Sequence, residues 1–313
     1  MGNDAKNDRT LNKSMANMAI DTNNSYQQIV ILSDIHLPGE NLPVKEKVVE
    51  RINSWEDTDM VVVLGDIVAT SGTVDEYIFA KRFLDELNKP YRVIGGNHEY
   101  LYKDSFLINE ETGCHFKETC PEARKEKLEL FRRTWCLDEI FYSERMGDYL
   151  LVFLTADGLF TNNYTEMSFR QLQWLDAELE RNKELPTIIF FHGPLKGSYY
   201  SKRINKKNPD SNDAEPVGII KEILIKNKQV FLWVAGHKHI RASDEDFASS
   251  INMYQDQVWV IHNPTLEQPK NQDKIWTNSL FLYSDRVIIK TYDHIQGQWL
   301  KTLERTFKVP SKM

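Results

Sequence analysis

Three stretches decide the fold: IVILSDIH at Ile29–His36, MVVVLGD at Met60–Asp66 and YRVIGGNHE at Tyr91–Glu99. In each, an apolar run long enough for a buried strand ends on Asp, His, Asn or Glu. The pattern recurs in TIIFFH at Thr187–His192 and in VFLWVAGHKH at Val230–His239. A buried strand needs no polar residue at its end, so five strands that end this way indicate side chains converging on one point. We interpret that point as a metal centre.

Amphipathic segments separate these strands. Apolar residues recur at helical spacing in Val44–Trp55, Phe79–Leu87, Ser168–Arg181 and Pro216–Asn227. Strands that alternate with helices of this length predict βαβ units and a mainly parallel sheet, whose ligands collect at the carboxyl ends of the strands. The polar clusters occupy those ends.

The rest of the chain predicts additions to this core. Residues 1–25 are polar and predict a disordered leader, which a single domain over 26–313 follows. Segments at about 100–147 and 196–216 interrupt the alternation, so we expect them to be inserted at the rim of the site. Beyond these, the pattern predicts antiparallel strands at Gln257–His262, Ser279–Tyr283, Val287–Tyr292 and Trp299–Phe307.

The composition limits the class of partner and the location. The chain has 313 residues, 41% of them hydrophobic, which is enough for a sizeable core. Its net charge of −7 argues against binding to duplex nucleic acid or to an anionic membrane surface. No apolar run approaches the roughly 18–20 residues of a membrane span. The start has no signal-like apolar core, which favours a cytoplasmic location; export with the signal already removed is the alternative.

Seven side chains at the strand ends are candidate metal ligands. Asp34 and His36 have the i, i+2 spacing that puts two side chains on one face of extended backbone. A set of this size exceeds the needs of one tetrahedral ion, but it suits two ions that share a carboxylate. Oxygen and nitrogen donors without thiolate fit Mn, Fe, Zn or Co. The seven candidates are Asp34, His36, Asp66, Asn97, His192, His237 and His239.

The ordered set resembles the calcineurin-like metallophosphoesterase superfamily over about Ile29 to His239. The resemblance implies an α/β four-layer α-β-β-α sandwich, in which two mixed β-sheets pack together between outer helices and the C-terminal strands belong to the second sheet. It implies one ion held by Asp34, His36, Asp66 and His239, and another held by Asp66, Asn97, His192 and His237. The motifs that carry it are Asp34-x-His36, Gly65-Asp66, Gly96-Asn97-His98-Glu99, His192 and Gly236-His237-x-His239.

The expected function is that of a dinuclear metal-dependent phosphoesterase. Two cations make a bridging hydroxide available near neutral pH and neutralise phosphate oxygens, so a phosphomonoester or phosphodiester is hydrolysed by in-line attack. Asp66 bridges the ions, and the resemblance implies that His98 assists the leaving group. A nucleotide or another small phosphoester is favoured. A phosphoprotein phosphatase, a nuclease and a catalytically silent protein-binding scaffold are the alternatives.

Two further features of the sequence bear on the site. Ala69 stands three residues after Asp66, where the family commonly has Asp or Asn, so a hydrogen bond near the site is missing or supplied elsewhere. The basic segment after His192 carries Tyr199, Tyr200 and Arg203, which we expect to bind the anionic or ring portion of the substrate. The sequence leaves the oligomeric state open.

Overall fold

The computed structural model describes residues 25–104, 107–109, 113–115, 117–200, 213–267 and 274–310. Nearly all of the predicted leader and all of Arg203 lie outside these residues. Where the side chains of cysteines are described, at Cys120 and Cys136, the thiols are free. No helix in these ranges is both long and apolar enough to cross a membrane.

Two mixed β-sheets form the centre of the molecule. We name them the β1 sheet and the β9 sheet. In the β1 sheet the strand order is β14 (Gln298–Trp299), β13 (Arg286–Asp293), β12 (Trp276–Leu282), β1 (Gln27–Leu32), β2 (Thr58–Leu64) and β3 (Tyr91–Ile94), and β15 (Arg305–Lys308) also pairs with β13. In the β9 sheet the order is β10 (Met253–Tyr254), β11 (Val258–His262), β9 (Val230–Ala235), β8 (Thr187–Phe190), β7 (Tyr149–Phe153) and β6 (Tyr142–Met146).

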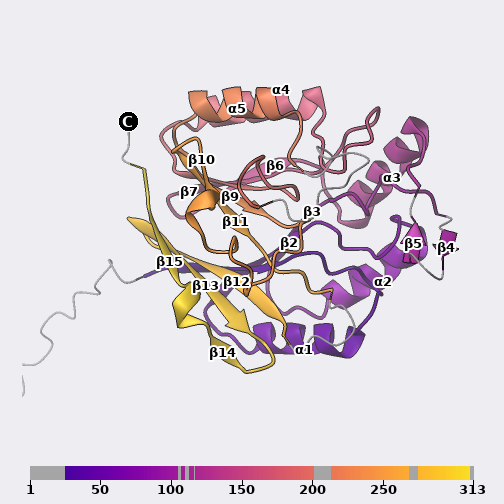
Figure 1. Cartoon of the computed structure of the whole chain (residues 1–313), viewed down its shortest axis with the longest axis horizontal. Coiled ribbons are helices and arrows are strands. Elements are labelled where there is room, and N and C mark those ends of the chain that lie inside the picture. Colours follow the sequence, from indigo (N-terminus) through magenta and orange to yellow (C-terminus); the bar gives the residue numbers. More distant parts are fainter. Residues whose placement is uncertain are drawn as a thin grey trace, which may run out of the picture.

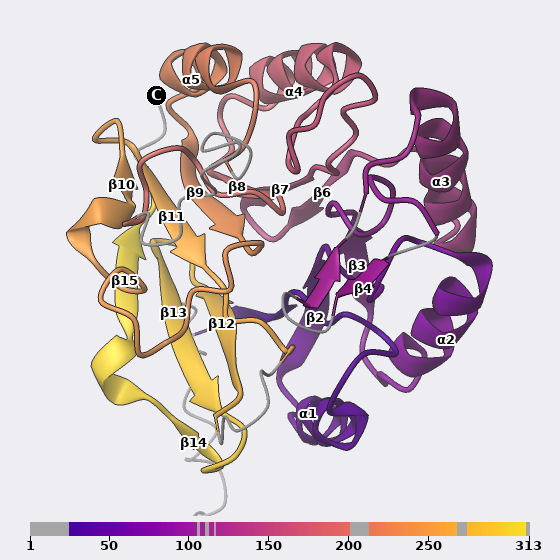
Figure 2. The ribbon, with the colours of Figure 1, turned by 45° about the vertical axis from the view of Figure 1, so that its right-hand side comes forward.

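Helices cover the outer faces of both sheets (Figures 1 and 2). On the β1 sheet lie α1 (Leu42–Asn53) and α2 (Val74–Leu84), with α3 (Pro121–Thr134) beside α2. On the β9 sheet lie α4 (Phe169–Arg181) and α5 (Val217–Lys226). The expected α-β-β-α order of layers is therefore confirmed. A small hairpin of β4 (Leu107–Asn109) and β5 (Gly113–His115), and the short 3₁₀ turns η2 (Ser250–Asn252) and η3 (Lys301–Leu303), complete the elements discussed here.

Alternation along each strand assigns side chains to the layers. In β1, Ile29 and Ile31 pack between the two sheets, whereas Val30 and Leu32 pack under α1 and α2. Residues two apart share a face of a strand, so one all-apolar strand can serve two cores. This double burial explains why these strands read as continuous apolar runs.

The predicted pairing of the strands was wrong in two respects. The five strands that end on polar clusters do not form one parallel sheet, because β1, β2 and β3 lie in one sheet and β8 and β9 lie in the other. Of the C-terminal strands, β11 runs parallel to β9, but β12 pairs antiparallel with β1 and so extends the first sheet. The spacing of apolar residues along a strand shows which of its faces is buried, but it does not show which strand lies beside it.

The stretch Trp299–Phe307 was also predicted wrongly as one strand. It contains the end of β14, the turn η3 and most of β15, and both strands pair with β13. The sequence pattern of a strand therefore continues through η3, where the chain turns. Only the pairing of β14 and β15 with β13 shows that there are two strands.

Candidate metal centre

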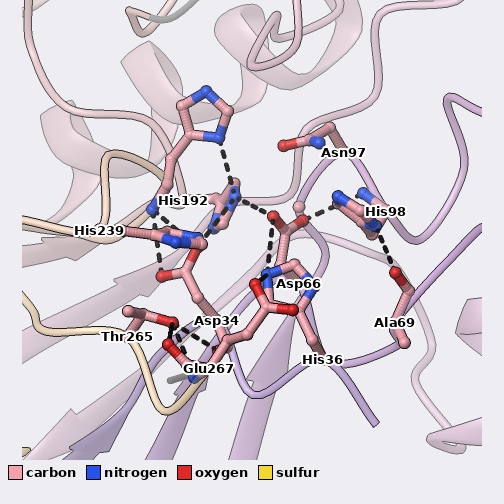
Figure 3. A network of polar contacts seen from close by, with 12 residues as sticks. Asp34, His36, Asp66, Ala69, Asn97, His98, His192, His239, Thr265 and Glu267 are labelled. Carbon is pink, nitrogen blue, oxygen red and sulfur yellow. Dashed lines mark hydrogen bonds and ion pairs between the residues drawn. The ribbon is translucent and has the colours of Figure 1, made fainter. Parts of the chain in front are cut away.

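The carboxyl ends of the five strands meet at one edge of the sandwich. Backbone hydrogen bonds tie the ends together: the His36 amide donates to the Asp66 carbonyl over 2.9 Å, and the Gly236 amide donates to the His192 carbonyl over 3.0 Å. The His237 amide donates to Asp34 Oδ1 over 3.1 Å, which joins the β9 sheet to the β1 sheet. Both sheets therefore contribute side chains to the same place (Figure 3).

Five of the predicted ligands have a left-handed backbone. The φ angles are +49° at Asp34 and His36, +48° at Asp66 and His239, and +63° at His237. None of these is glycine, and each such residue costs on the order of 1–3 kcal/mol unless the surroundings impose it. The chain turns sharply at these residues, directly after each strand. Strained backbone at one cluster of polar residues is typical of a functional site.

Close approach of the loops requires glycine at two positions. A Cβ added to Gly96 would lie 2.4 Å from Asp66 Oδ1, and one added to Gly236 would lie 2.1 Å from Ser33 Oγ. Neither neighbour can move without displacing a candidate ligand, since Ser33 Oγ itself donates to Asp34. The glycines next to the ligands therefore let the loops pack together.

The candidate ligands form two groups. Atoms of Asp34, His36 and His239 lie within 4.8 Å of one another, as do atoms of Asp66, His192 and His237. Asp66 Oδ2 lies 3.1 Å from His192 Nε2 and 3.9 Å from His36 Nε2, so its carboxylate stands between the groups. His36, Asp66 and His98 form a third, overlapping group.

Two buried atoms of this cluster lack a hydrogen-bond partner: His36 Nε2 and Asn97 Oδ1. The Asn97 amide is oriented by its Nδ2, which donates to the Tyr102 hydroxyl over 3.0 Å. Similarly, His192 Nδ1 donates to the Leu64 carbonyl over 2.8 Å, which turns Nε2 toward Asp66. A buried polar atom left unpaired costs about 1–3 kcal/mol. A metal ion bound at each of the two atoms would satisfy it, and the oxygen and nitrogen donors around them are suitable metal ligands.

Opposite charges stabilise each other in the cluster. Burial opposes ionisation of Asp34, but the neighbouring His239 and His192 outweigh it and lower the pKa of Asp34 to about 2. Burial likewise opposes protonation of His192, but Asp66 and Asp34 raise the pKa of His192 to about 10. Burial and the nearby His98 lower the pKa of His36 to about 3. Without a metal ion, His192 therefore carries a proton at neutral pH.

Metal binding is expected to release that proton. His192 must be neutral to ligate, and its pKa of about 10 lies above the working range, so a higher pH removes the competing proton and strengthens binding. For each proton released, the apparent affinity should rise about tenfold per pH unit. Calorimetric titration of chelator-treated protein with Mn²⁺ or Zn²⁺, in two buffers of different ionisation enthalpy, counts the protons. Zero protons per ion, with an affinity independent of pH, would contradict this reading of His192.

His98 lies beside the ligands. Its backbone amide donates to Asp66 Oδ1, and its Nδ1 donates to the Ala69 carbonyl, both over 3.0 Å. The backbone of Ala69 therefore makes a hydrogen bond to His98 that its methyl side chain cannot make. The Ala69 carbonyl therefore fixes the orientation of the His98 ring beside Asp66.

Glu99 was not assigned a role from the sequence, but the structure gives it one. The buried carboxylate accepts hydrogen bonds from four backbone amides: Asp66 over 2.9 Å, Ile67 over 2.7 Å, Val68 over 3.1 Å and Gly96 over 2.6 Å. It thereby fastens the loop after β2 to the loop after β3. An acidic residue directly after a ligand-bearing glycine turn is the sequence feature that could have indicated this.

Glu267 was also missed, because it lies in the loop beyond the end of β11 at His262 and not at the strand end itself. The Thr265 hydroxyl donates to the Asp34 carbonyl over 3.0 Å, and the Glu267 amide donates to the same oxygen over 3.1 Å. These bonds place Glu267 Oε2 at 3.7 Å from His36 Nε2 (Figure 3). A half-buried carboxylate therefore borders the candidate site.

Two of the three predicted substrate contacts, Tyr199 and Tyr200, are among the described residues. The Tyr199 hydroxyl donates to Asp213 over 2.8 Å, and its ring lies edge-on to His262. Tyr200 is half exposed, and its amide donates to Asp246 over 2.9 Å. The substrate roles of Tyr199 and Tyr200 both stay predictions.

Two mixed β-sheets packed between helices, with Asp, His and Asn at the carboxyl ends of the strands, make the architecture of a metallophosphoesterase. The model of the calcineurin-like phosphoesterase family matches residues 28–241, which is more than half of the sequence. The chain belongs to the calcineurin-like phosphoesterase family.

Two curated relatives match parts of the chain. A glycerophosphodiester phosphodiesterase of Enterobacter lignolyticus is 28% identical over 153 residues, which are 47% of this chain and 46% of the relative. A probable cyclic nucleotide phosphodiesterase of Moraxella catarrhalis is 24% identical over 181 residues, 56% of this chain and 61% of the relative. The matches thus span about half of the length of these relatives.

Two solved structures share the fold. A dimetal phosphatase from Danio rerio superposes with a TM-score of 0.58 at 16% identity, over 91% of this chain and 99% of that one. A purple acid phosphatase from yellow lupin seeds superposes with a TM-score of 0.56 at 17% identity, over 91% of this chain and 54% of that one. At these identities the likeness establishes the architecture alone.

Proposed function

We propose that the chain is a metal-dependent phosphoesterase that uses two ions. Asp34, His36 and His239 would hold one ion, Asn97, His192 and His237 the other, and Asp66 would bridge them. The observation that carries the proposal is the pair of buried atoms without a hydrogen bond, His36 Nε2 and Asn97 Oδ1, beside Asp66 (Figure 3). The metal is Mn, Fe, Zn or Co on the grounds of its donors.

The chain's own residues divide the work of the reaction. Two bound ions would supply a water of lowered pKa and positive charge for the phosphoryl oxygens. Asp66 sets the spacing between the ligand groups, and the amide of His98 holds Asp66 Oδ1 in place. His98 donates a proton to the departing alkoxide, and the Ala69 carbonyl holds its ring in place through Nδ1.

We propose a small phosphodiester as the substrate class. The two curated relatives are described as phosphodiesterases of glycerophosphodiesters and of cyclic nucleotides. The carboxylate of Glu267 lies 3.7 Å from His36 Nε2. It therefore repels a phosphomonoester, which carries up to two negative charges, more strongly than a phosphodiester, which carries one. The net charge of −7 disfavours long nucleic acids.

Hydrolysis of para-nitrophenyl phosphate and of its bis-ester tests the proposal. The protein is stripped of metal and refilled separately with Mn²⁺, Zn²⁺, Co²⁺ or Mg²⁺. Turnover that returns with metal supports a phosphoesterase, and faster turnover of the bis-ester supports a diesterase. Two bound ions without turnover of either ester would favour the silent protein-binding scaffold.

Replacing His98 with Asn is expected to lower kcat by about 10²-fold or more, the usual contribution of a general acid. Metal content should be unchanged, because His98 is outside the proposed ligand set. The loss should shrink as the leaving group becomes more acidic, since a good leaving group needs no proton; a series of substituted phenyl esters measures this. An equal loss for every leaving group would assign His98 to positioning alone.

A further inference from the structure

Arg305 has an unusual environment far from the strand ends described above. It lies on β15 with its guanidinium carbon 5.1 Å from the centre of the Phe247 ring, and its Nη1 donates to the Phe247 carbonyl over 3.3 Å. The other two nitrogens, Nε and Nη2, are shielded from solvent and lack a hydrogen-bond partner. The side chain as a whole is half-buried.

The two unpaired nitrogens are the pair that recognises oxyanions. Nε and Nη2 lie on the same edge of the guanidinium, where their N–H groups point in parallel and form the fork that fits a carboxylate or a phosphate. Burial is the one cause that lowers the pKa of Arg305, to about 10, so the group keeps its charge at neutral pH. No ion pair of Arg305 is present in the described ranges. A buried charge of this kind is costly unless a partner arrives.

Arg305 is one of the residues that line a cleft. Its volume is about 400 Å³, and it is also lined by residues 248–250, Asn252, the middle of β11 and the rest of β15. Its lining residues include Arg305 and Lys308 and no acidic residue, and hydroxyl groups come from Ser249, Ser250 and Thr306. Two cations and several hydroxyls around an unfilled space match the chemistry of a bound phosphate group.

We propose that this cleft binds a phosphate-type oxyanion, toward which the Arg305 side chain turns Nε and Nη2 on binding, with Lys308 at its rim. The site is separate from the metal centre and does not depend on the proposed reaction. It adjoins the loop that follows His192, because Asn252 of the cleft wall donates to the Ser198 carbonyl over 2.9 Å and to the Asp246 carbonyl over 2.8 Å. An anion bound in the cleft would therefore stabilise the start of that loop through Asn252.

The test is to count bound phosphate on the full-length, metal-loaded chain by equilibrium dialysis. The wild type should bind one phosphate more per chain than Arg305→Gln, whether or not the metal centre also binds phosphate. Arg305→Lys keeps the charge but lacks the fork, so its affinity for that phosphate should fall about tenfold. In thermal unfolding, saturating phosphate should raise the Tm of the wild type by roughly 2–4 °C more than that of Arg305→Gln.

Arg181→Gln is the matched control, because Arg181 is an exposed arginine paired with Glu178 on α4. It removes the same charge and should leave the phosphate count unchanged. If Arg305→Gln does not fold, Lys308→Gln decides, with an expected several-fold loss of affinity. Methylphosphonate, which has no ester to hydrolyse, replaces phosphate in a parallel arm; tighter binding than phosphate indicates an organic phosphate as the natural occupant. Equal phosphate counts in the wild type and in Arg305→Gln would overturn the proposal.

Discussion

Replacing Asp66 with Ala is expected to abolish phosphoester hydrolysis, with a loss of about 10³-fold or more in kcat/KM. The carboxylate lies between the two ligand groups, 3.1 Å from His192 Nε2 and 3.9 Å from His36 Nε2. Without it, neither group keeps a full set of donors, and charge stabilisation worth several kcal/mol in the transition state is lost. Metal analysis should show fewer than two ions per chain.

Asp176→Ala controls for loss of a carboxylate as such, because Asp176 is a surface residue paired with Lys226 over 3.0 Å. This variant should keep its metal and its turnover. Asp66→Asn adds a further comparison, since it keeps the shape and removes the charge that an ion requires. Full turnover in Asp66→Ala, at unchanged metal content, would remove the bridging role from Asp66 and with it the two-ion proposal.

Replacing Glu99 with Ala is expected to destabilise the protein by roughly 3–5 kcal/mol, since four buried backbone amides lose their acceptor at once. Glu99→Gln should also destabilise it, because a side-chain NH₂ would face some of these N–H groups. Two of the amides belong to Asp66 and Gly96, so metal affinity should fall together with stability. Denaturant unfolding of the metal-free protein measures the first effect, and metal titration measures the second.

Glu76 offers a matched comparison for Glu99. Its carboxylate also accepts from several backbone amides, those of Thr70, Ser71 and Thr73, but these residues lie at the α2 end of the loop, away from Asp66. Glu76→Ala should therefore lower stability and leave the metal affinity of the folded protein unchanged. An equal loss of metal affinity in both variants would mean that general loosening, and not the position of Asp66, explains the effect of Glu99.

Local pattern was sufficient for most of the secondary structure. The strands at Tyr91–Ile94 and Val230–Ala235 have the bounds that their apolar runs predict. The helix beginning after Ser168 does so as well, because the Ser168 hydroxyl accepts from the Gln171 amide and caps it. These features depend on neighbours a few residues away, so a sequence contains them.

The pairing of strands depended on contacts that the sequence does not encode locally. β1 pairs with β12 across about 250 residues, and Gln28 lies opposite Phe281 in that pairing. An apolar strand in the middle of the chain fits either sheet equally well, since both sheets bury both faces of their central strands. Which sheet such a strand joins is decided only when all four layers pack together.

The candidate site shows the same division. By itself the sequence determined which side chains end the strands, and hence a family and a set of candidate metal ligands, because strand ends and ligand types are both local properties. Only the tertiary structure decided that the Ala69 carbonyl accepts a hydrogen bond from His98, that Glu99 holds two loops together and that Glu267 borders the cluster. These contacts join segments that lie far apart in the sequence through single hydrogen bonds or charges. Such contacts have no periodicity, and they exist only once the two sheets have packed.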